Sequence, residues 1–215
     1  MTPATPLTLH QLPLFPLQTV LFPGGRLPLR IFEVRYLDMV QRCHKAKAPF
    51  GVVCLTEGRE VAAASGTPEA FHPVGTLARI EQLEQPQPGL LHIDCLGQQR
   101  FRVTHAQKLP HGLWVADVQM LADDVLTPVT DDLSGTVHSL QQVLHSLSAQ
   151  GGDPQRMPVQ PPYAWHDAGW VANRWCELLP LPSELKQRLM ALDSPLLRLE
   201  LVGDLLEKMR IDSAR

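Results

Sequence analysis

The sequence has few aromatic residues and no excess of positive charge. Aromatic residues make up 6% of the 215 residues, and 19 Lys and Arg side chains stand against 22 Asp and Glu, a formal net charge of −3. Proteins that bind nucleic acid usually carry a basic surface and stack bases on aromatic rings. The composition therefore weighs against nucleic acid as the main partner, and we expect none.

Membrane-spanning runs and metal-ligand patterns are also missing. No apolar run approaches the roughly 20 residues that cross a bilayer. The apolar stretch at 12–22 is interrupted by prolines and has no basic residue before it, unlike a secretory signal. We therefore expect a cytoplasmic protein without membrane contact. The cysteines form no C-x-x-C pair and no zinc-like spacing with histidine, so we expect free buried thiols and no metal or other cofactor. They are Cys43, Cys54, Cys95 and Cys176.

Catalytic motifs are absent as well. The sequence contains no G-x-x-x-x-G-K-[ST], G-x-G-x-x-G, H-E-x-x-H or G-x-S-x-G pattern. Ser183 and Lys186 match an S-x-x-K spacing, but Ser183 follows Pro182 and is expected to cap a helix. His166 and Asp167 could imitate a base and its orienting carboxylate, but adjacent residues point in different directions, and Asp167 also fits a helix cap. We expect that the protein is not an enzyme.

The first 124 residues have the pattern of a small β barrel. Short strands follow each other at close spacing, and tight turns containing Gly and Pro connect most of them. One amphipathic helix is predicted at 32–47, where apolar residues recur at helical spacing. The predicted strands cover residues 11–17, 27–31, 50–55, 75–83, 91–95, 100–104 and 113–121.

Helical patterns replace the strands in the second part of the chain. Helices are predicted at 133–149, 169–179 and 183–192, and a last one begins at Pro195 after the cap Ser194. The pattern therefore predicts a β subdomain at 1–124 and a helical subdomain at 125–215. We expect the acidic pairs at 123–124 and 131–132 to be solvated linker and cap residues rather than a cation site.

Several motifs resemble those of one protein family. The first stretch contains LPLFPL at 12–17, VLFPG at 20–24, LPL at 27–29 and IFExRY at 31–36. Later stretches contain GTxAxI at 75–80, GxxRFxV at 97–103, AN at 172–173, LPL at 179–181 and KQ at 186–187. Together they resemble the N-terminal substrate-recognition domain of Lon-type ATP-dependent proteases.

The resemblance implies both a fold and a function. The implied fold is α+β, with an N-terminal PUA-like β pseudobarrel that contains one inserted helix, followed by a C-terminal α-helical bundle. The ATPase and Ser-Lys peptidase modules of the proteases are absent from this sequence, so the chain resembles a stand-alone Lon N-terminal-domain protein. The implied function is a non-enzymatic polypeptide-binding module, an adaptor in protein quality control. Its partners would be unfolded or tagged polypeptides and a protease or chaperone. The alternatives are an RNA-binding PUA-like protein and a small hydrolase whose residues converge only in three dimensions.

Within the first motif, the large apolar side chains are expected to form core. These are Phe15, Phe22, Ile31, Phe32 and Tyr36. The charged residues of the motifs, Glu33, Arg35 and Arg100, are expected to form a buried or half-buried ion-pair network that serves the scaffold.

The candidate binding residues lie in and just after the connector at 153–167. This connector is long for a link between two helices, and long connections are often functional. The candidates for holding a polypeptide are Met157, Tyr163, Trp165 and Trp170. Flexible and aromatic side chains can hold apolar segments without requiring one sequence. The alternative is that they cover the helical core, the commoner fate of large apolar side chains.

Overall fold

The computed structural model of the protein describes residues 7–58, 69–149 and 157–213. These residues form a six-stranded sheet and five α-helices, which confirms the expected combination of strands and helices. The chain divides into two compact units, Met1–Asp123 and Asp124–Arg215, and each is described by itself. The division falls one residue before the predicted boundary. The assignment of separate subdomains to 1–124 and 125–215 remains a prediction.

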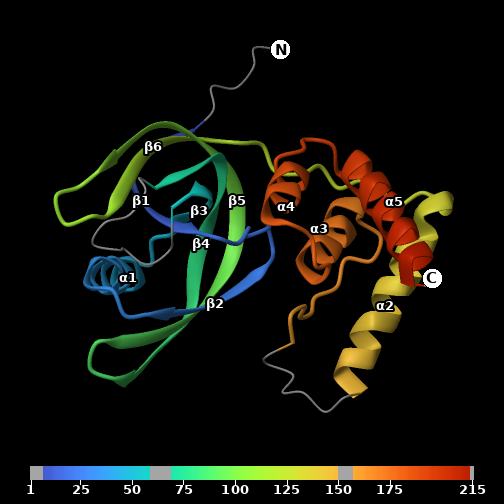
Figure 1. The fold of residues 1–215 in the computed structure, drawn as a ribbon, viewed down its shortest axis with the longest axis horizontal. Helices are drawn as coiled ribbons and strands as arrows, with labels where there is room; N and C mark the ends of the chain where they lie inside the picture. The colour runs from blue at the N-terminus through green and yellow to red at the C-terminus, as the bar shows by residue number, and fades with distance from the viewer. Residues whose placement is uncertain (1–6, 59–68, 150–156, 214–215) are drawn as a thin grey trace. The chain divides into compact units, whose positions relative to one another are not determined.

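The strands of the first unit form a closed ring of pairings (Figure 1). β1 pairs with β3 in parallel and with β6 antiparallel, β3 pairs with β4, β4 with β5, and β5 returns to β6. β2 lies outside this ring and pairs with β5. The elements are β1 (Thr8–Leu17), β2 (Arg26–Ile31), α1 (Val34–Ala46), β3 (Phe50–Glu57), β4 (Ala70–Gln87), β5 (Leu90–Lys108) and β6 (Trp114–Met120).

The strands predicted at 91–95 and 100–104 are one long strand, β5, so the predicted break between them, at Gly97, is wrong. The Gly97 amide donates to the carbonyl oxygen of Gly25 at 2.8 Å, and its carbonyl oxygen accepts from the Gly24 amide at 2.8 Å. A methyl group on Gly97 would collide with the carbonyl oxygen of Phe22. The glycine therefore marks the close approach of a neighbouring backbone, which is the other common reason for glycine within a strand.

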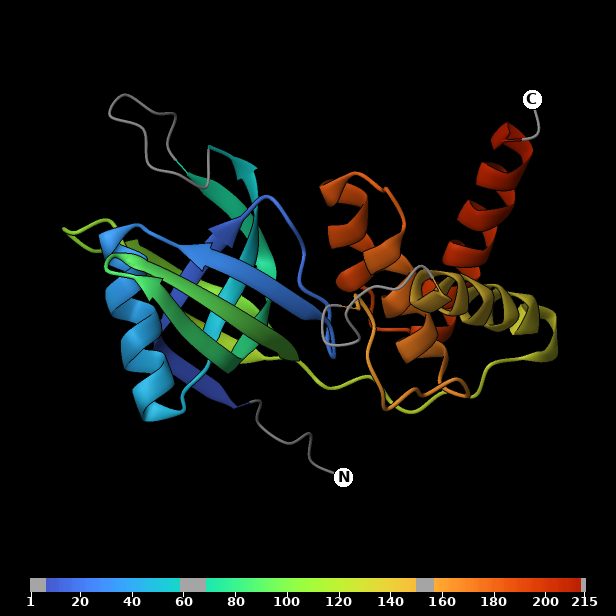
Figure 2. The same ribbon diagram turned by 90° about the horizontal axis from the view of Figure 1, so that it is seen from below.

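The larger core cluster of the first unit contains residues of the sheet and one face of α1, which lies beside the strands (Figure 2). The ring of Phe15 stacks on that of Tyr36 with 4.0 Å between the centroids. Each large apolar side chain buried in this way contributes about 1.5–3 kcal/mol to the stability of the unit. Four of the five predicted core residues are buried: Phe15, Phe22, Ile31 and Tyr36.

The fifth predicted core residue, Phe32, is 56% exposed, and the prediction is wrong. Ile31 is buried, so the alternation of an extended chain turns the next side chain outward. Val34 is 79% exposed, whereas only 18% of the Glu33 side chain and 6% of the Arg35 side chain are exposed. The burial in this stretch is therefore inverted: the charged pair lies inside and the apolar pair faces solvent.

Hydrogen bonds from Arg35 account for this inversion. Its Nη1 donates to the carbonyl oxygen of Gly112 at 2.7 Å, and its Nε donates to Glu33 Oε2 at 3.1 Å. A second carboxylate, Glu69, lies 3.5 Å from Nη1 and accepts a hydrogen bond from Trp114 Nε1 at 2.6 Å. Of the expected network of Glu33, Arg35 and Arg100, the ion pair between Glu33 and Arg35 is confirmed, and Arg100 is buried. The hydrogen bond from Arg35 to Gly112 fixes the start of α1 to the turn before β6.

The second unit contains four α-helices close to the predicted positions. They are α2 (Ser134–Ala149), which follows the 3-10 turn η1 (Asp131–Leu133), α3 (Ala168–Leu178), α4 (Ser183–Met190) and α5 (Pro195–Ser213). The Ser194 side chain caps α5 as predicted, because its Oγ accepts from the Leu197 amide at 3.3 Å. The prediction that Ser183 caps a helix is wrong, because Ser183 is the first residue of α4 and Pro182 is its N-cap residue. The glycines at 151–152, which the sequence predicts to end the helix at 133–149, lie outside the described residues. Within the described parts of the chain, no helix is long and apolar enough to cross a membrane.

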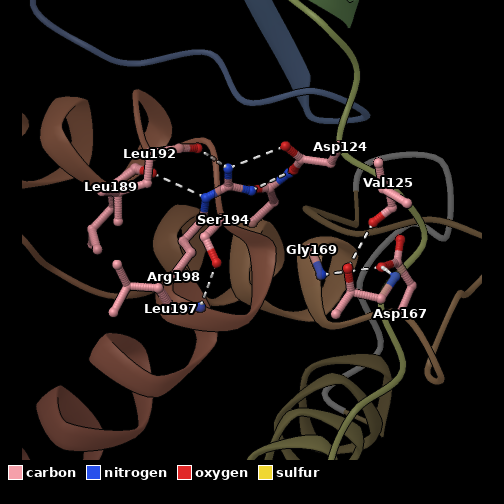
Figure 3. A network of polar contacts seen from close by, with 11 residues as sticks. Asp124, Val125, Asp167, Gly169, Leu189, Leu192, Ser194, Leu197 and Arg198 are labelled. Atoms are coloured by element: carbon pink, nitrogen blue, oxygen red, sulfur yellow. Dashed lines mark hydrogen bonds and ion pairs between the residues drawn. The ribbon is translucent and has the colours of Figure 1, made fainter. Parts of the chain in front are cut away.

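A buried arginine joins the elements of the second unit (Figure 3). The Arg198 side chain is 1% exposed, and its Nε donates to the carbonyl oxygen of Leu189 at 3.0 Å. Nη1 donates to Asp124 Oδ2 at 2.6 Å and Asn173 Oδ1 at 2.9 Å. Nη2 donates to the carbonyl oxygen of Leu192 at 2.6 Å and to Asp124 Oδ1 at 3.3 Å. All five N–H donors of the guanidinium group are therefore used.

The partner carboxylate corrects one expectation from the sequence. Asp124 is not a solvated linker residue, because 16% of its side chain is exposed and both oxygens accept from Arg198. Its neighbour Asp123 is exposed. A buried cation that loses its counter-charge is costly, typically by about 3–5 kcal/mol.

We predict that Asp124→Asn lowers the free energy of unfolding by about 3 kcal/mol, because the amide keeps the shape but leaves Arg198 without its counter-charge. Asp123→Asn is the matched control and should change the free energy of unfolding by no more than about 0.5 kcal/mol. Urea unfolding of both variants measures the difference. Equal stabilities of the two variants would contradict the assigned role of the ion pair.

Candidate functional site

Three of the four predicted binding residues form an aromatic cluster in the second unit. The ring centroids of Tyr163 and Trp165 lie 4.9 Å apart, and those of Trp165 and Trp170 lie 5.1 Å apart with an interplanar angle of 84°. Tyr163 and Trp170 complete the triangle at 6.1 Å. These separations and the edge-to-face angles are the ones that aromatic pairs prefer. The fourth residue, Met157, is half-buried, and none of these ring contacts includes it.

The N-terminal cap of α3 brings the rings together. Asp167 is the N-cap residue, as predicted, and its Oδ1 accepts from the Gly169 amide at 3.1 Å. The same oxygen accepts from the Thr127 amide at 3.4 Å, which fastens the extended segment before α2 to the start of α3 (Figure 3). Because Asp167 Oδ1 accepts hydrogen bonds from these backbone amides, we assign Asp167 the role of a helix cap rather than that of the orienting carboxylate in a catalytic pair with His166. The cap turns the chain so that Trp165 before it and Trp170 after it meet.

The cluster lies at the surface rather than in the core. Tyr163 is 42% exposed, and Trp165 and Trp170 are half-buried. The core tryptophan of this unit is instead Trp175, which is 4% exposed and donates from Nε1 to the carbonyl oxygen of Thr136 at 3.0 Å. Exposed aromatic rings that pack on each other offer a rigid apolar surface to a ligand at a small cost in side-chain entropy.

Arg174 of α3 lies next to the cluster and is connected to charged residues of α3 and α4. The guanidinium carbon of Arg174 is 5.8 Å from the Trp170 ring centroid, and its Nη2 donates to Glu177 Oε1 at 2.9 Å. Lys186 Nζ donates to the carbonyl oxygen of Glu177 at 3.2 Å. Burial raises the pKa of Glu177 to about 7, against the opposing effect of the two nearby cations. Burial also lowers the pKa of Arg174 and that of Lys186.

A second exposed apolar surface, which the sequence analysis missed, lies in the first unit. It consists of Phe32 and Val34, the outward pair of the inverted stretch described above. The alternation after the strand that ends at Ile31 was the signal that could have found it. The two surfaces belong to different units. Mutation of each surface separately can therefore show which of them binds an apolar polypeptide.

The described residues provide little for metal or thiol chemistry. Among them, no group of three or more His, Cys, Asp and Glu side chains lies close enough together to hold a metal ion. The four cysteines are free and buried, as the scattered spacing predicts. Burial raises the pKa of Cys95 and that of Cys176 to about 12, so both thiols stay protonated and unreactive.

Comparison with known proteins identifies the family. The sequence profile of the ATP-dependent protease La (LON) substrate-binding domain matches residues 11–208. The chain belongs to this family. The match extends over both units of the Lon substrate-binding domain described here and confirms the resemblance drawn from the motifs.

Solved structures agree with this assignment. A Lon N-terminal domain protein from Xanthomonas campestris is 29% identical with a TM-score of 0.71, over 91% of this chain and 98% of that one. The N-terminal domain of the Lon protease of the Mycobacterium avium complex is 16% identical with a TM-score of 0.55, over 90% and 96% of the two chains, and this likeness concerns the fold alone.

Curated relatives are longer than the matched region. Protein cereblon from Gallus gallus is 26% identical over 159 residues, which are 73% of this chain and 31% of that protein. Protein cereblon from Xenopus tropicalis is 28% identical over 120 residues, which are 54% of this chain and 25% of that protein. The chain therefore matches less than a third of the length of these relatives.

The environment of Glu177 gives a testable dependence of stability on pH. Its pKa rises from 4.5 to about 7 in the folded chain, so its contribution to stability is complete below pH 4.5 and is lost as the pH rises through 7. We expect Glu177→Gln to remove this loss. A shift of one pKa unit corresponds to about 1.4 kcal/mol. The free energy of unfolding of the parent protein, relative to that of Glu177→Gln, should therefore fall by up to about 3 kcal/mol between pH 5 and 8.

Urea unfolding across this pH range measures the difference. Glu200→Gln, on the exposed face of α5, is the control and should keep the pH dependence of the parent protein. A constant difference in stability between Glu177→Gln and the parent protein at every pH would contradict the prediction.

Proposed function

We propose that the protein is a non-enzymatic module that binds unfolded or tagged polypeptides and serves as an adaptor in protein quality control. The observation that carries the proposal is the exposed aromatic cluster of Tyr163, Trp165 and Trp170. A family of substrate-binding domains supplies the context. The polypeptide would contact this cluster and Met157, and a protease or chaperone would receive it, in the cytoplasm.

The physical basis of the proposal is the kind of surface that the cluster offers. Ring faces and a thioether contact apolar side chains through dispersion and area burial, which require no particular sequence. Unfolded chains expose such side chains, whereas folded proteins bury most of them. A site of this type therefore selects for the unfolded state rather than for a motif.

The proposal includes the finer architecture that the resemblance implies. We take residues 1–124 as a PUA-like pseudobarrel and 125–215 as a helical bundle. The ring of strand pairings, which the pairing of β5 with β6 closes, supports the first assignment. The packing of α3 against α5 supports the second.

We predict that Tyr163→Ala and Trp165→Ala each weaken binding of an unfolded polypeptide by about 1 kcal/mol or more, because each removes part of a ring surface. The probe is a reduced, carboxymethylated and fluorescently labelled protein, and fluorescence anisotropy measures its affinity. Melting temperatures should change little, because Tyr163 is 42% exposed and Trp165 is half-buried.

The control variant is Phe32→Ala, which removes an exposed ring from the other unit. Loss of affinity in this variant alone would move the site to the Phe32 and Val34 surface. Unchanged affinity in both cluster variants would rule the cluster out. A salt series separates polypeptide from RNA as the ligand, because RNA binding should weaken steeply with increasing salt.

A further inference from the structure

The last helix of the second unit carries apolar residues on both of its sides. Leu199 and Val202 of α5 are 0% exposed and face the other helices. On the opposite side Leu197 is 43% exposed and Leu201 is 38% exposed. Leu205, one turn further, is half-buried. Residues four apart lie on one face of a helix, so these three leucines form a continuous line, which we call the outer leucine stripe.

A helix that packs on one side normally carries its apolar residues on that side and polar residues on the other. In α5 only the inner side is covered, and Figure 2 shows the later turns of α5 projecting beyond the other helices of this unit. Single exposed leucines are common on protein surfaces, but leucines aligned over successive turns are typical of a helix that contacts a partner.

Acidic residues run beside the stripe and restrict the chemistry of such a partner. Glu200, Asp204 and Glu207 are exposed and recur at helical spacing on α5, next to the leucines. The described exposed residues of α5 include one base, Lys208. The surface therefore combines an apolar line with a negatively charged border, and its complement is an apolar line with a positively charged border.

This charge disfavours two other occupants. An anionic membrane surface attracts basic helices and repels acidic ones. A second copy of α5 would bring its own acidic border against Glu200, Asp204 and Glu207, and like charges placed against each other across an interface are costly.

We propose that the outer leucine stripe of α5 is a docking surface for a basic amphipathic helix of a partner protein. The leucines of the partner would pack between Leu197, Leu201 and Leu205, and its Lys or Arg residues would lie against the acidic border. The stripe shares no residue with the aromatic cluster, and the inference does not depend on the proposed function.

The test uses two synthetic helical peptides and the full chain. Both carry leucines along one face, with lysines beside them in the first peptide and glutamates in the second. Fluorescence anisotropy at low salt should show binding of the lysine peptide, weaker binding as salt increases, and at least about tenfold weaker binding of the glutamate peptide.

Two variants locate the binding. Leu197→Ser combined with Leu201→Ser should reduce the affinity for the lysine peptide at least about tenfold, whereas Leu126→Ser, at an exposed leucine outside α5, should leave it unchanged. Glu200→Lys combined with Asp204→Lys should reverse the preference in favour of the glutamate peptide. This second variant keeps the leucines and therefore tests the charge independently of the packing.

Other results would overturn the proposal. Equal affinity for both peptides would contradict it, as would unchanged affinity for the lysine peptide in the leucine variant. Loss of lysine-peptide binding in Trp165→Ala would place that peptide on the aromatic cluster. Self-association of the parent chain that the leucine variant abolishes would identify a second copy as the occupant. Leucine-dependent binding to anionic vesicles would identify a membrane.

Discussion

The second unit depends on one buried charge. Arg198 is 1% exposed, and it links α5 to Asn173 of α3, to the backbone at the end of α4 and to Asp124 at the start of the unit. Apolar packing is tolerant of small shifts, but a guanidinium group must find all its acceptors in fixed directions, because an unmet buried donor or charge is costly. The arginine therefore specifies one arrangement of these elements. Because this fixes the position of α3, it also fixes Trp170, which lies in the first turn of α3 and is part of the aromatic cluster.

The first unit uses an arginine in a similar way, with a different result for the surface. Arg35 turns inward to Glu33 and to the carbonyl oxygen of Gly112, so the residues between and beside this pair turn outward. Phe32 and Val34 are exposed as a consequence. In both units the buried ionic contact thus decides which apolar side chains are left for a partner.

The two exposed surfaces of the second unit differ in the chemistry that they offer. The aromatic cluster presents ring faces near Arg174, whose guanidinium group donates a hydrogen bond to Glu177, so contact area dominates there. The outer leucine stripe of α5 has a border of carboxylates, so charge selects its partner as much as area does. A module with both surfaces could hold a polypeptide on one and a second protein on the other.

The sequence by itself determined the order and type of the elements, because hydrophobic periodicity, turn residues and caps such as Asp167 and Ser194 act over a few residues. It also determined the family, since the motifs at 12–36 and 75–103 are local strings. Only the tertiary structure decided which residues meet. The burial of Arg198 against Asp124 and the continuity of β5 through Gly97 depend on residues far apart in the chain, which local patterns do not encode. Long-range pairing of charges and close backbone approach are set by the packed chain as a whole, so they became visible only in the folded protein.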